Sequence, residues 1–237
     1  MLAEIAFPHA TGVVLFAAAA LILVVYRRTG VVSLVYLALG FIFVGIESFL
    51  DGYEAQLLYE AAGGDWNALA GTQELSKILM IDTIRGIFIV LWASMEVMFA
   101  ASLSGSENKA IVYGVPAAIA AIGTIQTIYF NHYSGITPLS DRIYASSAIR
   151  VMGILVPVAL IVGGYLLASL YRTLQTKSIL FYGLGFVIHG LTLPTYTVAK
   201  EAGTVALGLW YAFGGVIPAL FAAYATILLE KESKEAI

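Results

Sequence analysis

Residues Val31–Leu50 read VVSLVYLALGFIFVGIESFL, and Glu47 is the only charged side chain in this run. A helix of about 20 predominantly apolar residues is long enough to cross the hydrocarbon core of a bilayer. Comparable apolar runs occupy most of the chain on both sides of this stretch. The sequence therefore predicts seven transmembrane helices, at approximately 5–26, 31–50, 78–103, 111–131, 146–171, 179–197 and 204–229.

The composition is that of an integral membrane protein. Of the 237 residues, 60% are hydrophobic and 11% are charged, whereas soluble domains carry about 25% charged residues. Because the seven runs leave little chain over, we expect one all-α domain that covers residues 1–237. We also expect contact with the lipid bilayer, a location in the plasma membrane and no nucleic-acid partner. A homo-oligomer or a larger membrane complex stays open.

The basic residues predict how the helices are oriented. Cytoplasmic loops of membrane proteins carry an excess of lysine and arginine. With the N-terminus outside, the cytoplasmic side receives Arg27, Arg28, Lys109, Arg172, Lys177, Lys231 and Lys234. The outer side then receives only Lys77, Arg142 and Lys200. We therefore expect an outside N-terminus and a cytoplasmic C-terminus.

An internal repeat is visible when the chain is compared with itself. An offset of 145 residues places Tyr26–Gly45 on Tyr171–Gly190, with seven identities in twenty positions. The identities include an arginine and a loop serine, which apolar composition does not explain. Because membrane transporters are often built from repeats, we predict two parallel three-helix repeats, 1–103 and 146–229, joined by a linking helix at 111–131.

Three carboxylates follow one another at the end of the second apolar run. Glu47, Asp51 and Glu54 are spaced by four and then three residues, so they lie on one face of a helix. A carboxylate inside a span is costly, which makes Glu47 a candidate functional residue. Asp51 and Glu54 follow nearer the surface and could be ordinary interfacial acids. Glu54 is expected to lie closest to water and to tolerate replacement best.

Further charged and polar residues lie inside the predicted spans. Asp82 and Arg85 share one face of the third span, Arg150 lies about one turn inside the outer end of the fifth, and the sixth carries His189. Only Glu96 lies nearer the cytoplasm. The sequence predicts an outward-facing polar cavity in which Glu96 is the inner station. Its predicted residues are Glu47, Asp51, Asp82, Arg85, Glu96, Arg150 and His189.

Each of these residues also has a purely structural interpretation. Asp82 and Arg85 could form an ion pair that fixes the packing of the second and third spans. Arg150 could extend toward lipid headgroups. A buried glutamate could be protonated and hydrogen-bonded to a neighbouring helix, and His189 could be a structural histidine with satisfied hydrogen bonds.

The sequence argues against two familiar cofactors. The last span contains no lysine before Lys231 at its end, so ordinary retinal chemistry is not expected. The three histidines lie in different segments, which disfavours a haem with two histidine ligands. Zinc accepts both histidine and carboxylate ligands. The metal content therefore stays open, with these candidate ligands: His189, Glu47, Asp51 and Asp82.

The loops and the buried charges together lead to three functional hypotheses. The longest loop, 51–77, is predicted to form a short interfacial helix capped by Asp65 and anchored by Trp66. The leading hypothesis is transport or conduction of a small solute or cation, with proton involvement. The alternatives are a sensor or accessory subunit that binds a partner through its outer loops, and a membrane metalloenzyme. Of these classes, an enzyme is the less favoured.

Overall fold

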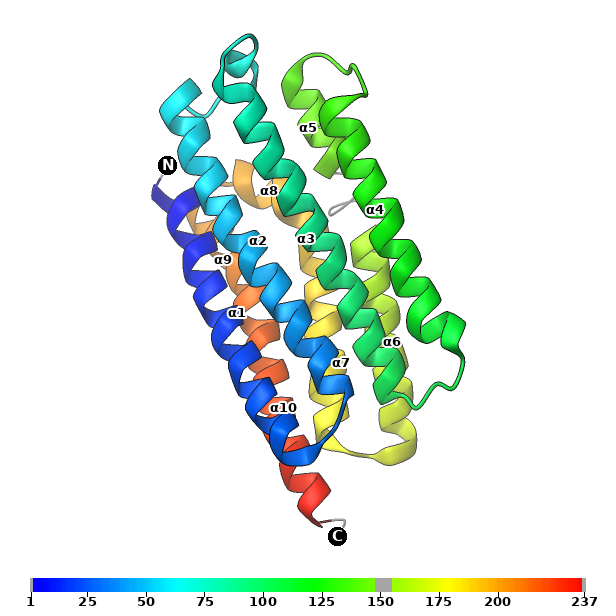
Figure 1. Ribbon diagram of the computed structural model, residues 1–237. Coiled ribbons are helices and arrows are strands. Elements are labelled where there is room, and N and C mark those ends of the chain that lie inside the picture. The colour runs from blue at the N-terminus through cyan, green and yellow to red at the C-terminus, as the bar shows by residue number, and fades with distance from the viewer. Residues whose placement is uncertain (1, 148–154, 236–237) are drawn as a thin grey trace.

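A computed structural model describes residues 2–147 and 155–235 (Figure 1), and all regular elements in these ranges are helices. The first half contains α1 (Leu2–Thr29), α2 (Ser33–Ala62), η1 (Trp66–Leu69), α3 (Glu74–Leu103), η2 (Ala110–Gly114), α4 (Val115–His132) and α5 (Leu139–Ser147). The second half contains α6 (Leu155–Leu174), α7 (Lys177–Thr192), η4 (Leu193–Thr195), α8 (Tyr196–Glu201), α9 (Thr204–Tyr211), η5 (Ala212–Val216) and α10 (Ile217–Glu235).

The prediction of seven membrane-length helices is confirmed. Seven helical stretches in the described ranges are long and apolar enough to cross a bilayer. They are Leu2–Thr29, Ser33–Ala62, Glu74–Leu103, Ala110–His132, Val156–Leu174, Lys177–Glu201 and Thr204–Glu235. These spans imply contact with lipid.

The predicted end of the second span was wrong. The second span does not stop at Leu50, because α2 continues through the carboxylates to Ala62. It ends where Gly63 adopts a left-handed conformation, with φ of 62°, and donates its N–H to the Tyr59 carbonyl at 3.0 Å. Glycine adopts this conformation without a Cβ penalty. Apolar composition therefore located the membrane-length part of this helix but not the point where the helix ends.

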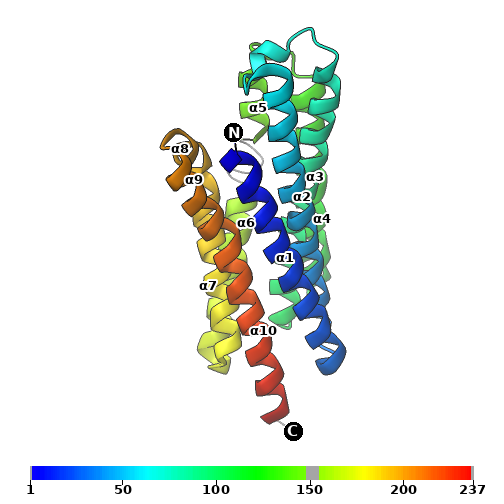
Figure 2. The same cartoon turned by 90° about the vertical axis from the view of Figure 1, so that its left-hand side faces the viewer.

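The helices form an elongated bundle in which chain neighbours pack side by side (Figures 1 and 2). α2 packs between α1 and α3, and α7 packs between α6 and α10. Contacts of α3 with α6 and of α1 with α10 join these two groups, and α4 lies against α3. One end of the bundle, here the N end, carries the N-terminus, η1, α5 and α8. The opposite C end carries the terminus of α10 and the connections α1–α2, α3–η2 and α6–α7.

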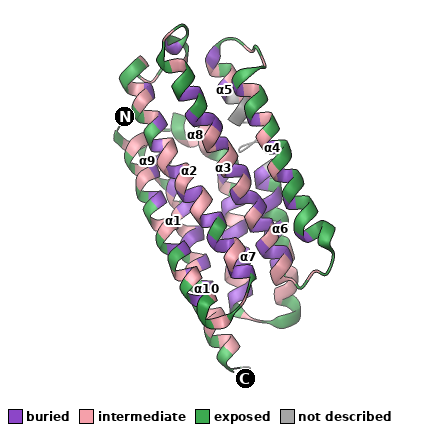
Figure 3. Ribbon diagram, viewed as in Figure 1, coloured by how far each residue is buried: buried purple, intermediate pink, exposed green. Residues whose placement is uncertain are grey.

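The central and C-end parts of the bundle are filled by a continuous apolar core (Figure 3). Its largest side chains include Phe41, Trp92, Phe99 and Tyr182, which are almost completely buried. Several large apolar side chains of α4 face outward, where they suit contact with lipid. In a bilayer such helices associate through close packing and interhelical hydrogen bonds, because lipid is as apolar as the core.

Candidate functional site

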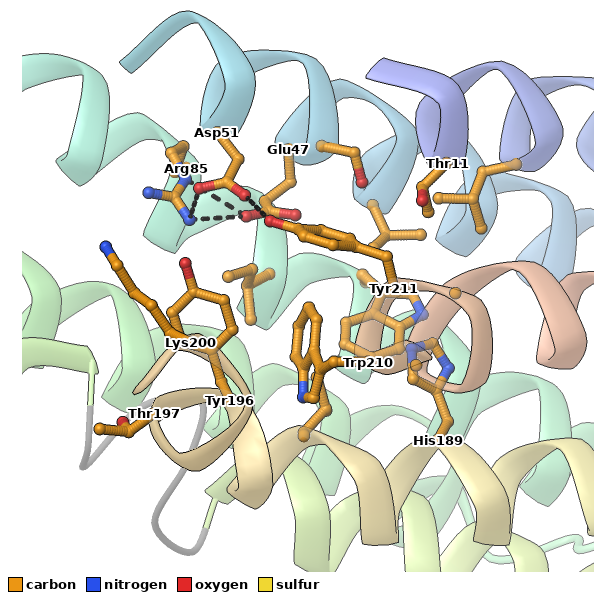
Figure 4. A pocket seen from close by; sticks show the side chains of 18 of the residues that line it. Thr11, Glu47, Asp51, Arg85, His189, Tyr196, Thr197, Lys200, Trp210 and Tyr211 are labelled. Carbon is orange, nitrogen blue, oxygen red and sulfur yellow. Dashed lines mark hydrogen bonds and ion pairs between the residues drawn. The ribbon is translucent and has the colours of Figure 1, made fainter. Parts of the chain in front are cut away.

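A cavity of about 280 Å³ lies inside the N-end half of the bundle (Figure 4). Its upper lining includes partly exposed residues from η1, α5 and α8, whereas its deepest lining residues are buried. The cavity therefore faces the N end and closes toward the middle of the bundle. Its polar and aromatic lining residues include Thr11, Glu47, Asp51, Trp66, Arg85, Trp92, His189, Tyr196, Lys200, Trp210 and Tyr211.

One wall of the cavity is formed by an arginine that shares four carboxylates. Arg85 Nη2 lies 3.1 Å from Glu47 Oε1 and 2.6 Å from Asp51 Oδ1. Arg85 Nη1 lies 2.9 Å from Glu54 Oε2 and 3.8 Å from Asp82 Oδ1. We call these five residues the Arg85 cluster. The planar guanidinium presents five N–H donors in a fixed fork, which allows one side chain to bridge several carboxylates.

Helix periodicity explains how this cluster forms. The predicted single face of α2 is confirmed, because Glu47, Asp51 and Glu54 all reach the same guanidinium of α3. Arg85 thus connects α2 to α3, whereas its contact with Asp82 lies within α3. The expectation that Glu54 lies nearest water was wrong. Glu54 is only 5% exposed. Because α2 continues as a helix past the apolar run, the Glu54 side chain faces α3 and not water.

Asp82 extends the cluster toward α4 and does not line the cavity. Asn131 Nδ2 donates to Asp82 Oδ2 at 2.6 Å and to Thr83 Oγ1 at 2.9 Å. Thr83 Oγ1 also lies 2.9 Å from His132 Nε2. Asp82 and Asn131 are both buried. Sequence reasoning missed Asn131, although an amide near the end of an apolar span could have indicated an interhelical hydrogen bond.

The opposite wall is aromatic and was also missed in the sequence. The ring centroids of Tyr196 and Trp210 lie 4.8 Å apart, and those of Trp210 and Tyr211 lie 5.0 Å apart. We call these three residues the aromatic wall. The Tyr211 hydroxyl donates to Asp51 Oδ2 at 2.5 Å, which joins this wall to the Arg85 cluster (Figure 4). Trp210 Nε1 donates to the Thr192 carbonyl at 2.9 Å.

Trp92 and His189 form the floor of the cavity. Their ring centroids lie 4.4 Å apart, and both residues are almost fully buried. Within residues 2–147 and 155–235, the imidazole side chain of His189 makes no hydrogen bond, although its backbone carbonyl accepts from the Leu193 N–H. This finding disfavours the interpretation of His189 as a structural histidine with satisfied hydrogen bonds. Its ring nitrogens stay available to a molecule in the cavity.

Glu96, which the sequence analysis assigned to the cavity, lies behind this floor and does not line the cavity. Trp92 Nε1 donates to Glu96 Oε1 at 2.8 Å. Glu96 is 1% exposed, and its Oε2 atom has no hydrogen-bond partner among the described residues. An unpartnered buried polar atom is costly, so it calls for an explanation in function or protonation. Trp92 separates this carboxyl from the cavity.

The remaining predicted residues have separate outcomes. Arg150 lies outside the described residues. Lys200, at the mouth of the cavity, lies 3.2 Å from Glu4 Oε1. Asp65 does cap the short η1 helix, because its Oδ1 accepts from the Asn67 backbone N–H at 2.9 Å. Trp66 lines the cavity mouth, in addition to any contact with the membrane surface.

The proposed zinc ligands are not grouped as a metal site. In the described part of the chain, no set of three or more histidine and carboxylate side chains has the geometry to hold a metal ion. His189 belongs to the floor of the cavity, beside Trp92. The carboxylates Glu47 and Asp51 instead contact Arg85 and Tyr211. The arrangement is suited to binding a molecule between a charged wall and an aromatic wall.

The fold and the site together define a class of protein: a seven-helix integral membrane protein with a polar and aromatic cavity open toward one end. Comparison of the chain with protein-family models, with curated proteins and with solved structures found no match. The function must therefore be argued from the site itself.

Proposed function

We propose that this protein is a membrane carrier that takes up a small solute or cation into the cavity from outside. The observation that carries the proposal is the cavity itself, which places the Arg85 cluster on one wall inside the span of seven helices. Ionisable residues within membrane spans are expensive and commonly mark substrate or ion pathways. A purely structural ion pair would not need a space beside it.

Interrupted helices beside the cavity support this proposal. The sixth span passes from α7 through the 3₁₀ segment η4 into α8, and the seventh contains the π-helical segment η5. Gly214 and Gly215 of η5 and Leu193 of η4 line the cavity. Transporters often bind substrate at discontinuous helices near the middle of the membrane, and π-helical segments are frequent at functional sites.

The closed floor supports a carrier over an open channel. The cavity ends at Trp92 and His189, and the core beyond them includes Phe99, Tyr182 and Phe186. A carrier exposes its site to one side at a time, with the other side closed by packed helices. In this proposal the described conformation is the one open at the N end.

Glu96 is the residue that we propose to link transport to protons. Its carboxyl is buried behind the cavity floor, with one oxygen bonded to Trp92 and the other without a partner. Carboxyl side chains inside membrane spans commonly belong to proton relays, and the free oxygen of Glu96 could carry a proton without losing a hydrogen bond. Protonation and release at this position would change the hydrogen bonding of the floor.

The proton hypothesis leads to a flux prediction. In liposomes loaded with a pH-sensitive dye, the wild-type protein should give solute-dependent proton movement, tested with sodium, potassium, tetramethylammonium and choline. Glu96→Gln should keep the protein folded but flatten the pH dependence of flux, since an amide cannot release a proton. Glu60→Gln is the matched control and should behave as wild type, because Glu60 is exposed, accepts from Gln56 at 2.8 Å and does not line the cavity. An unchanged pH profile in Glu96→Gln would contradict the role of Glu96.

We also propose that the N end faces outward. The support is the segregation of charge, because the seven residues assigned to the cytoplasm include Arg27, Arg28 and Lys109 near the C-end connections. The chain contains no cysteine, so single cysteines can report orientation. Ser104→Cys should react with a membrane-impermeant reagent only from the cytoplasmic side, and Gly63→Cys only from outside. Labelling in the opposite sense would reverse the proposed orientation.

The two-repeat architecture is part of the same proposal. A Cβ added at Gly45 would meet Phe16 of α1, and one added at Gly190 would meet Ile161 of α6. These two contact pairs are separated by the same 145-residue offset. Similarly, Gly40 of α2 faces α3, and Gly185 of α7 faces α10. Equivalent glycines thus have equivalent neighbours, which supports α1–α3 and α6, α7 and α10 as parallel repeats.

A ligand sensor is the second candidate function. The N end carries a small folded cover in which η1 is joined to α5, because Asn67 and Ser140 exchange hydrogen bonds at 3.1 and 3.2 Å. A cavity with a closed floor below such a cover also suits a receptor that reports occupancy to a partner. Ligand binding to the purified protein without flux of any tested solute in liposomes would favour the sensor.

A further inference from the structure

We infer that the cavity binds an organic monocation that carries a hydrogen-bonding group. The cationic group would lie between Glu47 and Asp51 on one side and the aromatic wall on the other. The hydrogen-bonding group would contact His189 at the floor. The inference names the ligand class of the cavity on which the proposed transport function depends.

The first argument is the charge of the Arg85 cluster. Four carboxylates share one guanidinium, which leaves a formal excess of three negative charges when all of them are ionised. Lys200 also lines the cavity, but its charge is offset by Glu4 at 3.2 Å. Arg150 carries a single positive charge. The donors of Arg85 are directed at carboxylates of the chain itself, so they are not free to receive an anionic ligand. A cation beside Glu47 and Asp51 would reduce the excess.

The second argument is the composition of the facing wall. Trp210 and the two tyrosines that contact it present three aromatic rings to the cavity. Ammonium groups are attracted to aromatic faces, and cages of aromatic residues are a common way to bind quaternary ammonium. A metal ion would gain little from such a wall, because small hard cations require several oxygen ligands at short range. The wall therefore favours an organic cation over an inorganic one.

The third argument is the unsatisfied histidine at the floor. His189 is 2% exposed and lines the cavity, and its imidazole makes no hydrogen bond to any other described residue. Buried polar side chains are normally hydrogen-bonded. A hydroxyl, carbonyl or amine of the ligand would satisfy one ring nitrogen. A ligand that reaches from Asp51 to His189 would therefore carry a polar group at some distance from its charge.

The cavity volume limits the size of this ligand. A cavity of about 280 Å³ corresponds to roughly nine water molecules at their liquid volume of about 30 Å³ each. A molecule of about ten non-hydrogen atoms would fill it. Choline has seven non-hydrogen atoms, a quaternary ammonium and a hydroxyl, which makes it a suitable probe.

Binding can be read from the protein's own fluorescence. All three tryptophans of the chain, Trp66, Trp92 and Trp210, line the cavity. Titration of the purified protein with choline should change the emission with a saturable dependence. The uncharged isostere of choline, in which carbon replaces the ammonium nitrogen, should bind at least about tenfold more weakly. Isothermal titration calorimetry with choline and with its uncharged isostere gives an independent measurement of the two affinities.

Matched variants separate the two ends of the ligand. Trp210→Leu should weaken choline binding by about tenfold, and Trp210→Phe should retain most of it, because phenylalanine keeps an aromatic face. His189→Phe should weaken choline binding by about fivefold but leave tetramethylammonium, which lacks a hydroxyl, unaffected. Tyr182→Phe is the control outside the cavity. Thermal unfolding confirms that each variant is folded.

The outcomes separate this inference from the proposed transport function. The inference would be overturned if choline and its uncharged isostere bound equally well. It would also be overturned if neither choline nor tetramethylammonium showed saturable binding. Flux of an inorganic cation or a neutral solute without organic-cation binding would leave the carrier proposal standing alone. Choline binding without flux would support the ligand class and contradict the carrier.

Discussion

The Arg85→Met variant is expected to lose about 3–5 kcal/mol of its free energy of unfolding. Removal of one partner from a buried ion pair leaves an uncompensated charge, which costs about this much. Here one guanidinium serves four carboxylates on α2 and α3, so its loss would leave all four facing one another. Denaturant unfolding in detergent micelles, compared with wild type, measures the effect.

Two further variants show whether charge or shape is responsible. Arg85→Lys keeps the charge but replaces a planar fork by a compact ammonium, so it should lose less stability than Arg85→Met. Combining Arg85→Met with Glu54→Gln and Asp82→Asn should restore part of the stability, because two carboxylates become neutral amides. Wild-type stability in Arg85→Met would mean that the carboxyls are neutral in the native protein and that Arg85 is not holding an ionic cluster.

Replacement of Trp92 by alanine is expected to have an effect of similar size. Trp92 is 1% exposed and belongs to the central core, and truncation of a buried tryptophan to alanine typically costs about 3–5 kcal/mol. The variant would also remove the donor to Glu96 Oε1, which leaves both carboxyl oxygens without a partner among the described residues. Thermal and denaturant unfolding should both detect the loss.

A double-mutant cycle separates packing from hydrogen bonding at this site. Trp92→Phe retains an aromatic ring but removes the indole N–H, so Glu96 becomes unsatisfied. Glu96→Met keeps a side chain of similar length without a polar group. If the hydrogen bond matters, the stability lost in Trp92→Phe should be partly regained when Glu96→Met is added. Simple additivity of the two changes would show that Trp92 acts through packing alone.

Much of the candidate site could be anticipated from residue spacing. Glu47 and Asp51 lie four residues apart, and Arg85 lies three residues after Asp82, so helical geometry alone places each pair on one face. The cavity-lining positions of Glu47, Asp51, Arg85 and His189 agree with the sequence prediction. The polar residues were detectable because charge is rare inside apolar spans.

Other features required the packing of helices that are distant in sequence. Glu54 is buried because α2 continues past the apolar run and faces α3. Asn131 joins Asp82 only because α4 lies against α3. Tyr211 reaches Asp51 across 160 positions of the chain. Tyrosine and tryptophan are common near the ends of membrane helices, so composition does not distinguish an aromatic wall from an interfacial belt.

The sequence by itself determined that the protein has seven membrane-length helices and that carboxylates follow one face of the second. Both results depend on local properties, namely apolar run length and the 3.6-residue helical period. Only the tertiary structure decided which groups meet in space. It placed four carboxylates on one arginine, set three aromatic rings opposite them and put Glu96 behind Trp92. The reason is that interhelical contacts depend on the rotation and register of packed helices, which a single sequence does not specify.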